Sequence, residues 1–222
     1  MKNVLITGTS RGIGLELARK FLAKGYKVYG TSRYSNTNII HQNFECLTLD
    51  LSDLESIGNL ETIINKKDLK FDLLINNAGI GPDLDTENPE IESFNTTFNV
   101  NVVGTTFLTE KLLKHLNEKA KILIISSKMG SLNICERSDS VAYRMSKTAV
   151  NMYAKTLSIR LKNHHDVACL HPGWVKTTIA KSNITEGRLT SEESADKIYD
   201  FITHNFENGI FWNVETNDKC EW

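Results

Sequence analysis

The sequence has little proline and no surplus of charge of either sign. Only 3 of its 222 residues are proline, 26 basic residues nearly balance 27 acidic ones, and the formal net charge at pH 7 is -1. A balanced surface of this kind has no strong field to attract nucleic acid or an anionic membrane. We therefore expect neither of them as a partner.

Long hydrophobic runs and metal-binding patterns are also missing. The chain enters an apolar run at residue 4, with no basic stretch and secretory apolar core ahead of it, and no apolar run approaches the length of a membrane span. The four cysteines form no C-x-x-C pair, and the six histidines show no H-E-x-x-H spacing. We expect a cytoplasmic protein with reduced thiols and no metal site.

Short apolar runs alternate with amphipathic stretches along the whole chain. The runs are nearly continuous in Val, Ile, Leu, Phe and Tyr, which is typical of strands in a sheet covered on both faces. This βαβ order predicts one domain over residues 1–222, an α/β Rossmann-like fold with a doubly wound parallel sheet of about seven strands and helices on both faces. The expected strands are 2–7, 26–31, 44–49, 71–77, 120–126, 166–171 and 209–214, and the expected helices are 12–24, 53–66, 90–117, 141–163 and 191–206.

A glycine-rich turn joins the first expected strand directly to the first helix. Glycines in such a turn let the backbone approach a pyrophosphate, and the start of the helix supplies unpaired N–H groups and positive potential. A tight turn without a ligand is the alternative. The order of strand, turn and helix favours a dinucleotide-binding site that includes Gly8, Ser10, Arg11, Gly12, Ile13 and Gly14.

The end of the second expected strand bears on which dinucleotide is bound. An NAD-specific site usually has a carboxylate at this point, whereas an arginine suits a 2′-phosphate. The strand ends in Arg33, with no acid, and Arg11 lies in the glycine turn. Both could be solvated surface charges, but together they favour NADP(H) over NAD(H).

The third expected strand ends in Asp50 and Leu51. The carboxylate could meet the amino group of an adenine, with Leu51 beside it. It could equally cap the next helix, as Ser52 or Asp53 also could.

The fourth expected strand leads into Asn76-Asn77-Ala78-Gly79. This small, amide-rich run lies at the carboxyl edge of the sheet, where open α/β sheets bind their ligands. The asparagines could brace neighbouring strands while Gly79 leaves room for a cofactor. A plain polar turn is the alternative, and the two interpretations are compatible.

Tyr143 and Lys147 are four residues apart in the expected helix 141–163, so they project from one face. An ammonium beside a phenol stabilises the phenolate and lowers a pKa that is ordinarily near ~10, which makes a usable general acid and base. An isolated Tyr-x-x-x-Lys is more often an exposed helical pair. The motifs that precede it favour the catalytic interpretation here.

With these motifs in this order, the chain resembles the short-chain dehydrogenase/reductase family over nearly its whole length. The likeness is closest to the small C-factor/sniffer-like carbonyl reductases, on residues 126–131, 142–147 and 170–177 and on a Trp at position 222. The resemblance implies an NADP(H)-dependent oxidoreductase that reduces an aldehyde, ketone or quinone to an alcohol by hydride transfer.

The resemblance also implies roles for single residues. Tyr143 would donate the proton with the help of Lys147. Ser127, rather than Ser126, would hold the carbonyl oxygen, and Asn101 would connect Lys147 to solvent through a water. The residues implied against the cofactor are Asn77, Ala78, Gly79, Tyr143, Lys147, Pro172, Gly173, Val175 and Thr177.

Specificity and assembly are less constrained by the sequence. Met129, Leu132, Ile134, Trp174 and residues 80–82 could line an apolar pocket, or be core or oligomer contacts. The segment after Thr178 is brief, so we expect a small lid. The resemblance implies a homodimer or homotetramer paired through helices 90–117 and 141–163.

Two other functions are compatible with the same motifs. One is an NADP-binding regulatory or signalling protein with little turnover. Because Asn101, Ser127, Tyr143 and Lys147 are all present, the enzyme is the better interpretation. The other is an NAD-linked alcohol dehydrogenase that works oxidatively.

Overall fold

One sheet of eight strands forms the centre of the molecule. The computed structural model describes residues 1–34 and 38–222. The strands lie in the order β3-β2-β1-β4-β5-β6-β7-β8. Neighbouring strands from β3 to β7 are parallel, and β8 is antiparallel to β7. The strands are β1 (Asn3–Ile6), β2 (Lys27–Ser32), β3 (Phe44–Thr48), β4 (Phe71–Asn76), β5 (Leu116–Ile125), β6 (Asp166–His171), β7 (Ile210–Asn213) and β8 (Asp218–Lys219).

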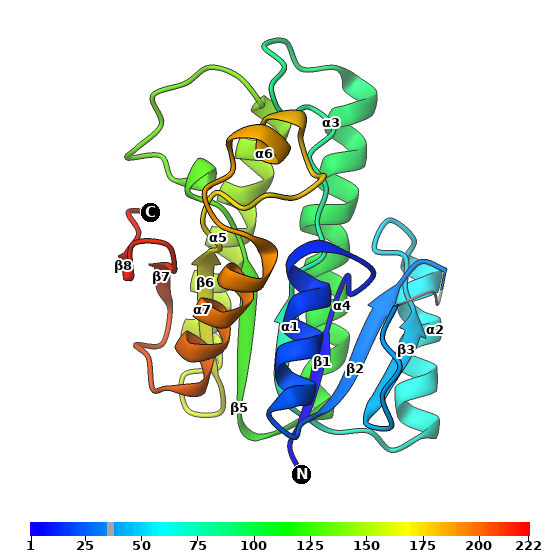
Figure 1. Cartoon of the computed structure of the whole chain (residues 1–222). Helices are drawn as coiled ribbons and strands as arrows, with labels where there is room; N and C mark the ends of the chain where they lie inside the picture. Colours follow the sequence, from blue (N-terminus) through cyan, green and yellow to red (C-terminus); the bar gives the residue numbers. More distant parts are fainter. Residues whose placement is uncertain (35–37) are drawn as a thin grey trace.

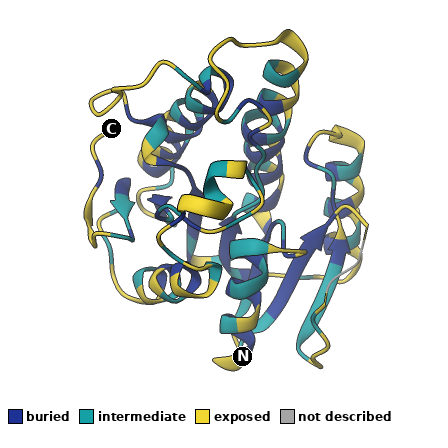
Figure 2. Ribbon diagram, turned by 45° about the horizontal axis from the view of Figure 1, so that its top comes forward, coloured by how far each residue is buried: buried dark blue, intermediate teal, exposed yellow. Residues whose placement is uncertain are grey.

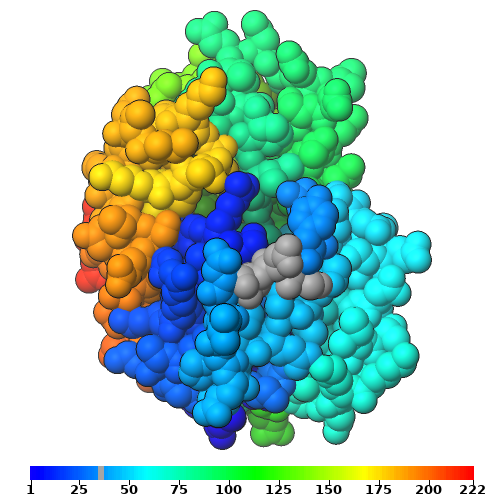
Figure 3. All heavy atoms as spheres, turned by 45° about the vertical axis from the view of Figure 1, so that its right-hand side comes forward, coloured from blue at the N-terminus to red at the C-terminus, as the bar shows by residue number. Residues whose placement is uncertain are grey.

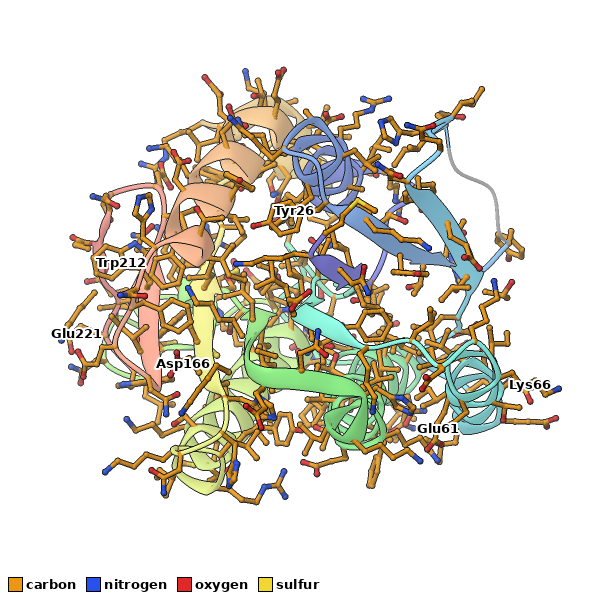
Figure 4. All side chains as sticks on the ribbon, turned by 90° about the horizontal axis from the view of Figure 1, so that it is seen from below. Tyr26, Glu61, Lys66, Asp166, Trp212 and Glu221 are labelled. Carbon is orange, nitrogen blue, oxygen red and sulfur yellow. The ribbon has the colours of Figure 1, made fainter. Side chains whose placement is uncertain are left out.

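Helices cover both faces of this sheet, as the continuous apolar runs predict. α1 (Gly12–Ala23) and α7 (Ser191–Thr203) lie on one face, and α2 (Leu54–Lys66), α4 (Thr105–Leu112) and α5 (Val141–Arg160) lie on the other (Figure 1). Seen from below, Tyr26 marks the first face and Glu61 the second (Figure 4). The predicted doubly wound α/β fold is confirmed.

The core is split by the sheet into two apolar layers. Leu17 and Phe21, four residues apart on α1, are fully buried against one face together with Ile198 of α7. Ile57 and Leu60 of α2 and Leu157 of α5 are buried against the other face. The strands between the layers are buried along most of their length (Figure 2). Each fully buried aliphatic side chain of this kind contributes about 1.5–3 kcal/mol of transfer free energy.

The sheet differs from the predicted one in two details. The strand β8 adds an eighth, antiparallel member, because the chain turns back after β7 and pairs Trp212 with Lys219. β5 begins at Leu116 and not near residue 120, and its register with β4 shifts between Phe71 and Leu73. Because several residues at the start of β5 are polar, the hydrophobic pattern of the sequence does not predict this part of the strand.

The expected helix 90–117 is several consecutive helical segments. α3 (Ile91–Phe98) runs into a π-helical segment, Asn99–Gly104, and then into α4. Such segments are uncommon and often occur at functional sites. A side chain at Gly104 would meet the carbonyl oxygen of Leu51 at 2.1 Å, so the helix can approach the end of β3 only with glycine there.

The strand order reverses between β1 and β4. The chain passes from β1 outward to β2 and β3, and then returns to β4 on the other side of β1. Crossovers that diverge from this point leave a crevice at the carboxyl ends of the two strands, which is where open α/β sheets bind ligands. Among the described helices, none is long and apolar enough to cross a membrane.

Candidate active site

Hydrogen bonds hold the ends of β1 and β4 together at the crevice. Thr7 Oγ1 accepts from the backbone N–H groups of Asn77 (3.0 Å) and Ala78 (2.9 Å). Asn77 Nδ2 donates in return to the carbonyl oxygens of Thr7 (2.9 Å) and Gly8 (3.3 Å). The predicted bracing of neighbouring strands is therefore made by Asn77. Asn76 instead donates to Thr109 Oγ1 of α4 at 3.0 Å.

The glycine turn requires glycine for two different reasons. Gly8 and Gly12 have φ angles of 74° and 59°, a region that glycine adopts without strain. Gly14 lies so close to the turn that a Cβ would be 2.2 Å from the carbonyl oxygen of Gly8. Helix α1 therefore starts in direct contact with the end of β1.

The start of α1 fits an anionic group. Arg11 occupies the N-cap position with extended backbone and makes no side-chain capping bond, and the first turn has no acidic residue. The first N–H groups of a helix lack partners within it, and they carry positive potential. Gly12, Ile13 and Gly14 thus provide backbone donors and open space where a pyrophosphate would lie, next to the exposed Ser10.

The predicted contacts to the adenosine end lie beside this turn. Arg33 is exposed and lies near Tyr34, with its guanidinium carbon 5.7 Å from the ring centroid. Hydrogen bonds from Ser52 and the positive charge of Arg33 lower the pKa of Asp50, although partial burial opposes them. Asp53, not Asp50, caps α2 by accepting from the N–H of Glu55 at 2.8 Å. Asp50 is thus not the helix cap, while Leu51 is buried in the core.

One cavity of about 520 Å³ extends from the crevice toward α5 and β6. The glycine turn approaches its far wall, since a Cβ on Gly12 would meet Thr177 Cγ2 at 3.6 Å. In the space-filling view, the yellow and orange segment near residues 175–190 lies beside the dark-blue N-terminal segment (Figure 3). The predicted residues that line the cavity are Ile13, Asn77, Gly79, Ser127, Tyr143, Lys147, Pro172, Gly173, Val175 and Thr177.

Tyr143 and Lys147 lie together on α5, as their spacing predicts. Lys147 Nζ is 5.5 Å from the centroid of the Tyr143 ring and donates to the carbonyl oxygen of Ile125 at 3.0 Å. Burial lowers the pKa of Lys147 to about 8. Burial also raises the pKa of Tyr143 to about 12, against a hydrogen bond with Ser127 that lowers it. The expected lowering by the nearby ammonium is therefore wrong for this structure, because desolvation of the phenolate is the larger effect.

The two adjacent serines after β5 have different surroundings. Ser126 Oγ donates to Asn151 Oδ1 at 2.6 Å and is buried between β5 and α5. Ser127 Oγ accepts from the N–H of Met129 at 3.1 Å, which leaves its own proton free for the hydrogen bond with Tyr143. Ser127 is thus the serine that faces the phenol, and its role toward a carbonyl oxygen stays a prediction.

Asn101 lies behind the cavity in the π-helical segment. Its Oδ1 accepts from the N–H of Ile80 at 2.9 Å, and its Nδ2 donates to the carbonyl oxygen of Ile80 (2.8 Å) and to Ser146 Oγ (3.1 Å). A Cβ on Gly79 would lie 3.3 Å from Asn101 Oδ1 and 3.5 Å from Lys147 Nζ. Gly79 therefore keeps open a space that both polar groups border.

The cavity wall is less apolar than the sequence predicts. Met129, Ile134 and Trp174 line it as expected. Leu132 is 77% exposed and outside the lining, because its N–H pairs with the carbonyl oxygen of Trp222. Residues 80–82 are also outside it, since Gly81 packs against the ring of Tyr143. Besides Lys147, the charged residues that line the cavity are Asp85, Lys128, Glu136, Arg137, Asp139 and Arg144.

A short helix borders the cavity where a small lid is expected. α6 (Lys181–Glu186) has six residues, and two of its side chains connect it to other segments. Ser182 Oγ donates to Asp85 Oδ1 at 3.0 Å, and Asn183 Nδ2 donates to the carbonyl oxygen of Val175 at 2.9 Å. A helix of six residues is too short to show a helical periodicity in the sequence. The hydrogen bond between Ser182 and Asp85 joins residues 97 positions apart, so sequence spacing does not predict it either.

Comparisons with known proteins agree with this geometry. The family model described as short chain dehydrogenase matches residues 2–188. A probable short-chain type dehydrogenase/reductase of Helicobacter pylori is 32% identical over 200 residues, covering 88% of this chain and 71% of that protein. Among solved structures, the carbonyl reductase Sniffer of Drosophila melanogaster is 28% identical with a TM-score of 0.89, and both chains are covered completely. An NADPH-bound carbonyl reductase from chicken fatty liver is 27% identical with a TM-score of 0.88, covering 100% of this chain and 99% of that one. The chain belongs to the short-chain dehydrogenase/reductase family.

Proposed function

We propose that this protein is an NADPH-dependent carbonyl reductase that converts an aldehyde, ketone or quinone to the alcohol. One observation carries the proposal: Ser127, Tyr143 and Lys147 line the same cavity as Ile13 of the glycine turn and Thr177 beyond β6. A proton donor and a hydrogen-bond donor for a carbonyl oxygen therefore share one space with the site that fits a dinucleotide.

Two features favour NADPH over NADH. Arg11 and Arg33 are both exposed at the edge of the crevice, where a 2′-phosphate would need cationic partners. The chicken carbonyl reductase, whose fold covers this whole chain, is described with NADPH bound. In the proposed complex, the N–H groups at the start of α1 hold the pyrophosphate and Asp50 lies near the adenine.

Tyr143 would be the proton donor. It is protonated at neutral pH, but burial raises its pKa to about 12 and makes it a weak acid, so proton transfer needs groups that stabilise the phenolate. NADPH, when bound, supplies the hydride to the carbonyl carbon. Ser127 would donate a hydrogen bond to the carbonyl oxygen, stabilising the charge that grows there, and Tyr143 would then protonate it.

Lys147 and Asn101 would support this proton transfer. Lys147 Nζ lies over the phenol ring, so its ammonium stabilises the phenolate as the proton leaves. Asn101 Oδ1 and Lys147 Nζ border the space that Gly79 keeps open. In the proposed mechanism, a water in this region connects Lys147 to solvent and resupplies the proton.

The cavity favours a substrate with an apolar body and a polar end. Met129, Ile134 and Trp174 offer apolar contact, while Arg137 and Asp139 lie along the same wall. Exposed apolar side chains on the outer helices, Phe107, Met152 and Ile159, support a homodimer or homotetramer. The assembly and the cytoplasmic location stay predictions.

A fluorescence titration with NADPH and NADH, followed by NADPH consumption across a carbonyl panel, tests the proposal. We expect NADPH to bind at least about tenfold more tightly than NADH, since about 1.4 kcal/mol from one charged contact suffices for that factor. Turnover on at least one aldehyde, ketone or quinone should follow. Binding without turnover on any carbonyl would favour the NADP-binding regulator, and equal affinities would favour the NAD-linked enzyme.

A further inference from the structure

The helix that carries Tyr143 has no cap of its own. Ser140, at the N-cap position of α5, has left-handed backbone (φ 58°, ψ 43°) and makes no side-chain capping bond, and the first turn has no acidic residue. The first N–H groups of a buried helix need partners from elsewhere. In α5 these N–H groups include those of Ala142 and of Tyr143 itself.

A carboxylate from a distant loop supplies the missing partners. Asp83, on the segment after β4, accepts from the N–H of Ala142 at 2.7 Å through Oδ2. Both of its oxygens accept from the N–H of Tyr143, each at 3.2 Å. The residue is 2% exposed, so these bonds are shielded from water. Hydrogen bonds to a charged group are stronger than those between neutral groups.

The loop that carries Asp83 is itself fixed to the site. Ile80 exchanges two backbone hydrogen bonds with the side chain of Asn101. A Cβ on Gly81 would lie 3.0 Å from Cδ2 of Tyr143, so the loop backbone packs on the ring. Thr86 Oγ1 donates to the carbonyl oxygen of Asp83 at 2.7 Å, which holds the turn. The loop thus contacts Asn101 at one end and the backbone of Tyr143 at the other.

We propose that Asp83 is a positioning residue for Tyr143, whose buried carboxylate caps α5 from outside the helix and fixes the backbone from which the phenol projects. The proposal rests on the proposed function where it concerns turnover. Nothing in the mechanism requires Asp83 to touch a substrate or cofactor. It acts through the backbone of Tyr143 and through its charge.

The charge of Asp83 has a second effect on Tyr143. After burial, which is the largest cause, the negative charge of Asp83 also raises the pKa of the phenol. The ammonium of Lys147 on the same helix is also close to the ring, and Ser127 contacts the phenol from the end of β5. The further charged residues around the cavity are Asp85, Lys128, Glu136, Arg137, Asp139 and Arg144. The charge of Asp83 therefore disfavours the phenolate form of Tyr143.

Two substitutions separate the geometric effect from the charge. Asp83→Asn retains an acceptor oxygen but loses the charge, and Asp83→Ala loses both. Asp53→Asn is the matched control, since Asp53 also caps a helix and lies outside the cavity lining. We expect Asp83→Ala to lower kcat by about 10- to 100-fold with little change in KM, because small displacements of a catalytic group have effects of that size.

The diagnostic measurement is the pH profile of kcat. Reduction needs a protonated phenol and, in the proposed mechanism, the ammonium of Lys147, so the rate falls first as Lys147 loses its proton near pH 8 and again as pH rises through the pKa of Tyr143. Removing the negative charge lowers the pKa of Tyr143, and we expect this second alkaline limb to move to lower pH in Asp83→Asn. Asp53→Asn should leave the limb in place. A merely structural role for Asp83 would lower activity or stability without moving the limb.

Two readouts do not depend on turnover. Hydrogen exchange at the Ala142 and Tyr143 amides should be at least about tenfold faster in Asp83→Ala than in the wild type. Tyrosinate absorbance, corrected with Tyr143→Phe backgrounds, should show Tyr143 titrating at lower pH in Asp83→Asn. If Asp83→Ala does not fold, Asp83→Asn supplies both readouts.

Unchanged amide exchange together with an unchanged titration of Tyr143 in a folded Asp83→Asn would overturn the role of Asp83. If the wild type reduces no carbonyl, the proposed function fails, but the amide exchange and the tyrosinate titration still decide whether Asp83 positions Tyr143. The two failures are therefore distinguishable.

Discussion

Ser126 Oγ donates a hydrogen bond of 2.6 Å to Asn151 Oδ1, which ties the end of β5 to the middle of α5. The amide of Asn151 donates in turn to the carbonyl oxygen of Gly130 at 3.2 Å. This buried connection gives Ser126 a structural role and leaves Ser127, the next residue, to face the phenol of Tyr143.

Substitution of Ser127 should therefore lower activity, whereas substitution of Ser126 should lower stability. We expect Ser127→Ala to lower kcat by about 10²–10³-fold with little loss of stability, as removal of one donor to a developing oxyanion does. Ser126→Ala should cost about 1–3 kcal/mol of unfolding free energy, because it leaves a buried acceptor on Asn151 unsatisfied. Steady-state kinetics and denaturant unfolding of both variants make the comparison. A loss of kcat in Ser126→Ala together with a loss of stability in Ser127→Ala would show that Ser126 is the catalytic serine and Ser127 the structural one.

Gly14→Ala tests the close approach of α1 to β1. The added Cβ would lie 2.2 Å from the carbonyl oxygen of Gly8, so the glycine turn must move. We expect a destabilisation of about 1–3 kcal/mol and at least tenfold weaker NADPH binding. Gly58→Ala in α2 is the control, because nothing lies within 4 Å of its added Cβ. That variant should be as stable as the wild type or up to about 1 kcal/mol more stable. Unaltered NADPH affinity in Gly14→Ala would argue against binding at this turn.

Lys147→Met should abolish turnover and yet stabilise the fold at neutral pH. Burial lowers the pKa of Lys147 to about 8, well below its ordinary value of 10.5, so the folded state carries an unfavourable buried charge at pH 7. We expect a gain of about 1–3 kcal/mol, reduced by the lost hydrogen bond to Ile125.

The sign of the pH dependence follows from proton binding. Between the folded pKa near 8 and the unfolded value of 10.5, the unfolded wild type binds more protons, so its stability rises with pH. The advantage of Lys147→Met should be largest below pH ~8 and shrink toward pH ~10.5. Urea unfolding at several pH values measures it. An advantage that grows with pH over this range would contradict the lowered pKa.

Arg33→Ala tests the preference for NADPH. Loss of a guanidinium that contacts a 2′-phosphate should weaken NADPH binding by about tenfold or more and leave NADH binding nearly unchanged. The effect should shrink at high salt, because Arg33 is exposed. Arg19→Ala is the control, an exposed arginine on α1 that pairs with Glu16. Equal losses for both cofactors would remove the argument for NADPH.

The positions of the strands along the chain and of the motifs could be predicted because they depend on local pattern. Continuous apolar runs specify strands in a covered sheet, and a four-residue spacing on a helix brings Tyr143 and Lys147 together. The likeness of residues 126–131 to a known family then selected Ser127. In each case, the signal lies within a few residues of the site it specifies.

The features that could not be predicted depend on long-range contacts or on competing energies. Asp83 caps a helix that starts almost sixty residues later, so no spacing connects the two. The direction of the pKa shift of Tyr143 depends on how deeply the phenol is buried, which spacing does not show. The exposure of Leu132 depends on where the C-terminal segment passes.

Tyr143→Phe provides the most direct test of the proposed reductase. The substitution removes only the hydroxyl, and NADPH affinity, followed by fluorescence, should change less than about threefold. Tyr153→Phe is the matched control on the same helix, since the Tyr153 hydroxyl donates to Glu110 at 2.8 Å and lies outside the cavity lining. NADPH consumption with a carbonyl that the wild type reduces is the decisive readout. We predict that Tyr143→Phe loses at least about 10³-fold in kcat, while Tyr153→Phe keeps turnover. A Tyr143→Phe variant that reduces the carbonyl at the wild-type rate would contradict the role of Tyr143 as proton donor.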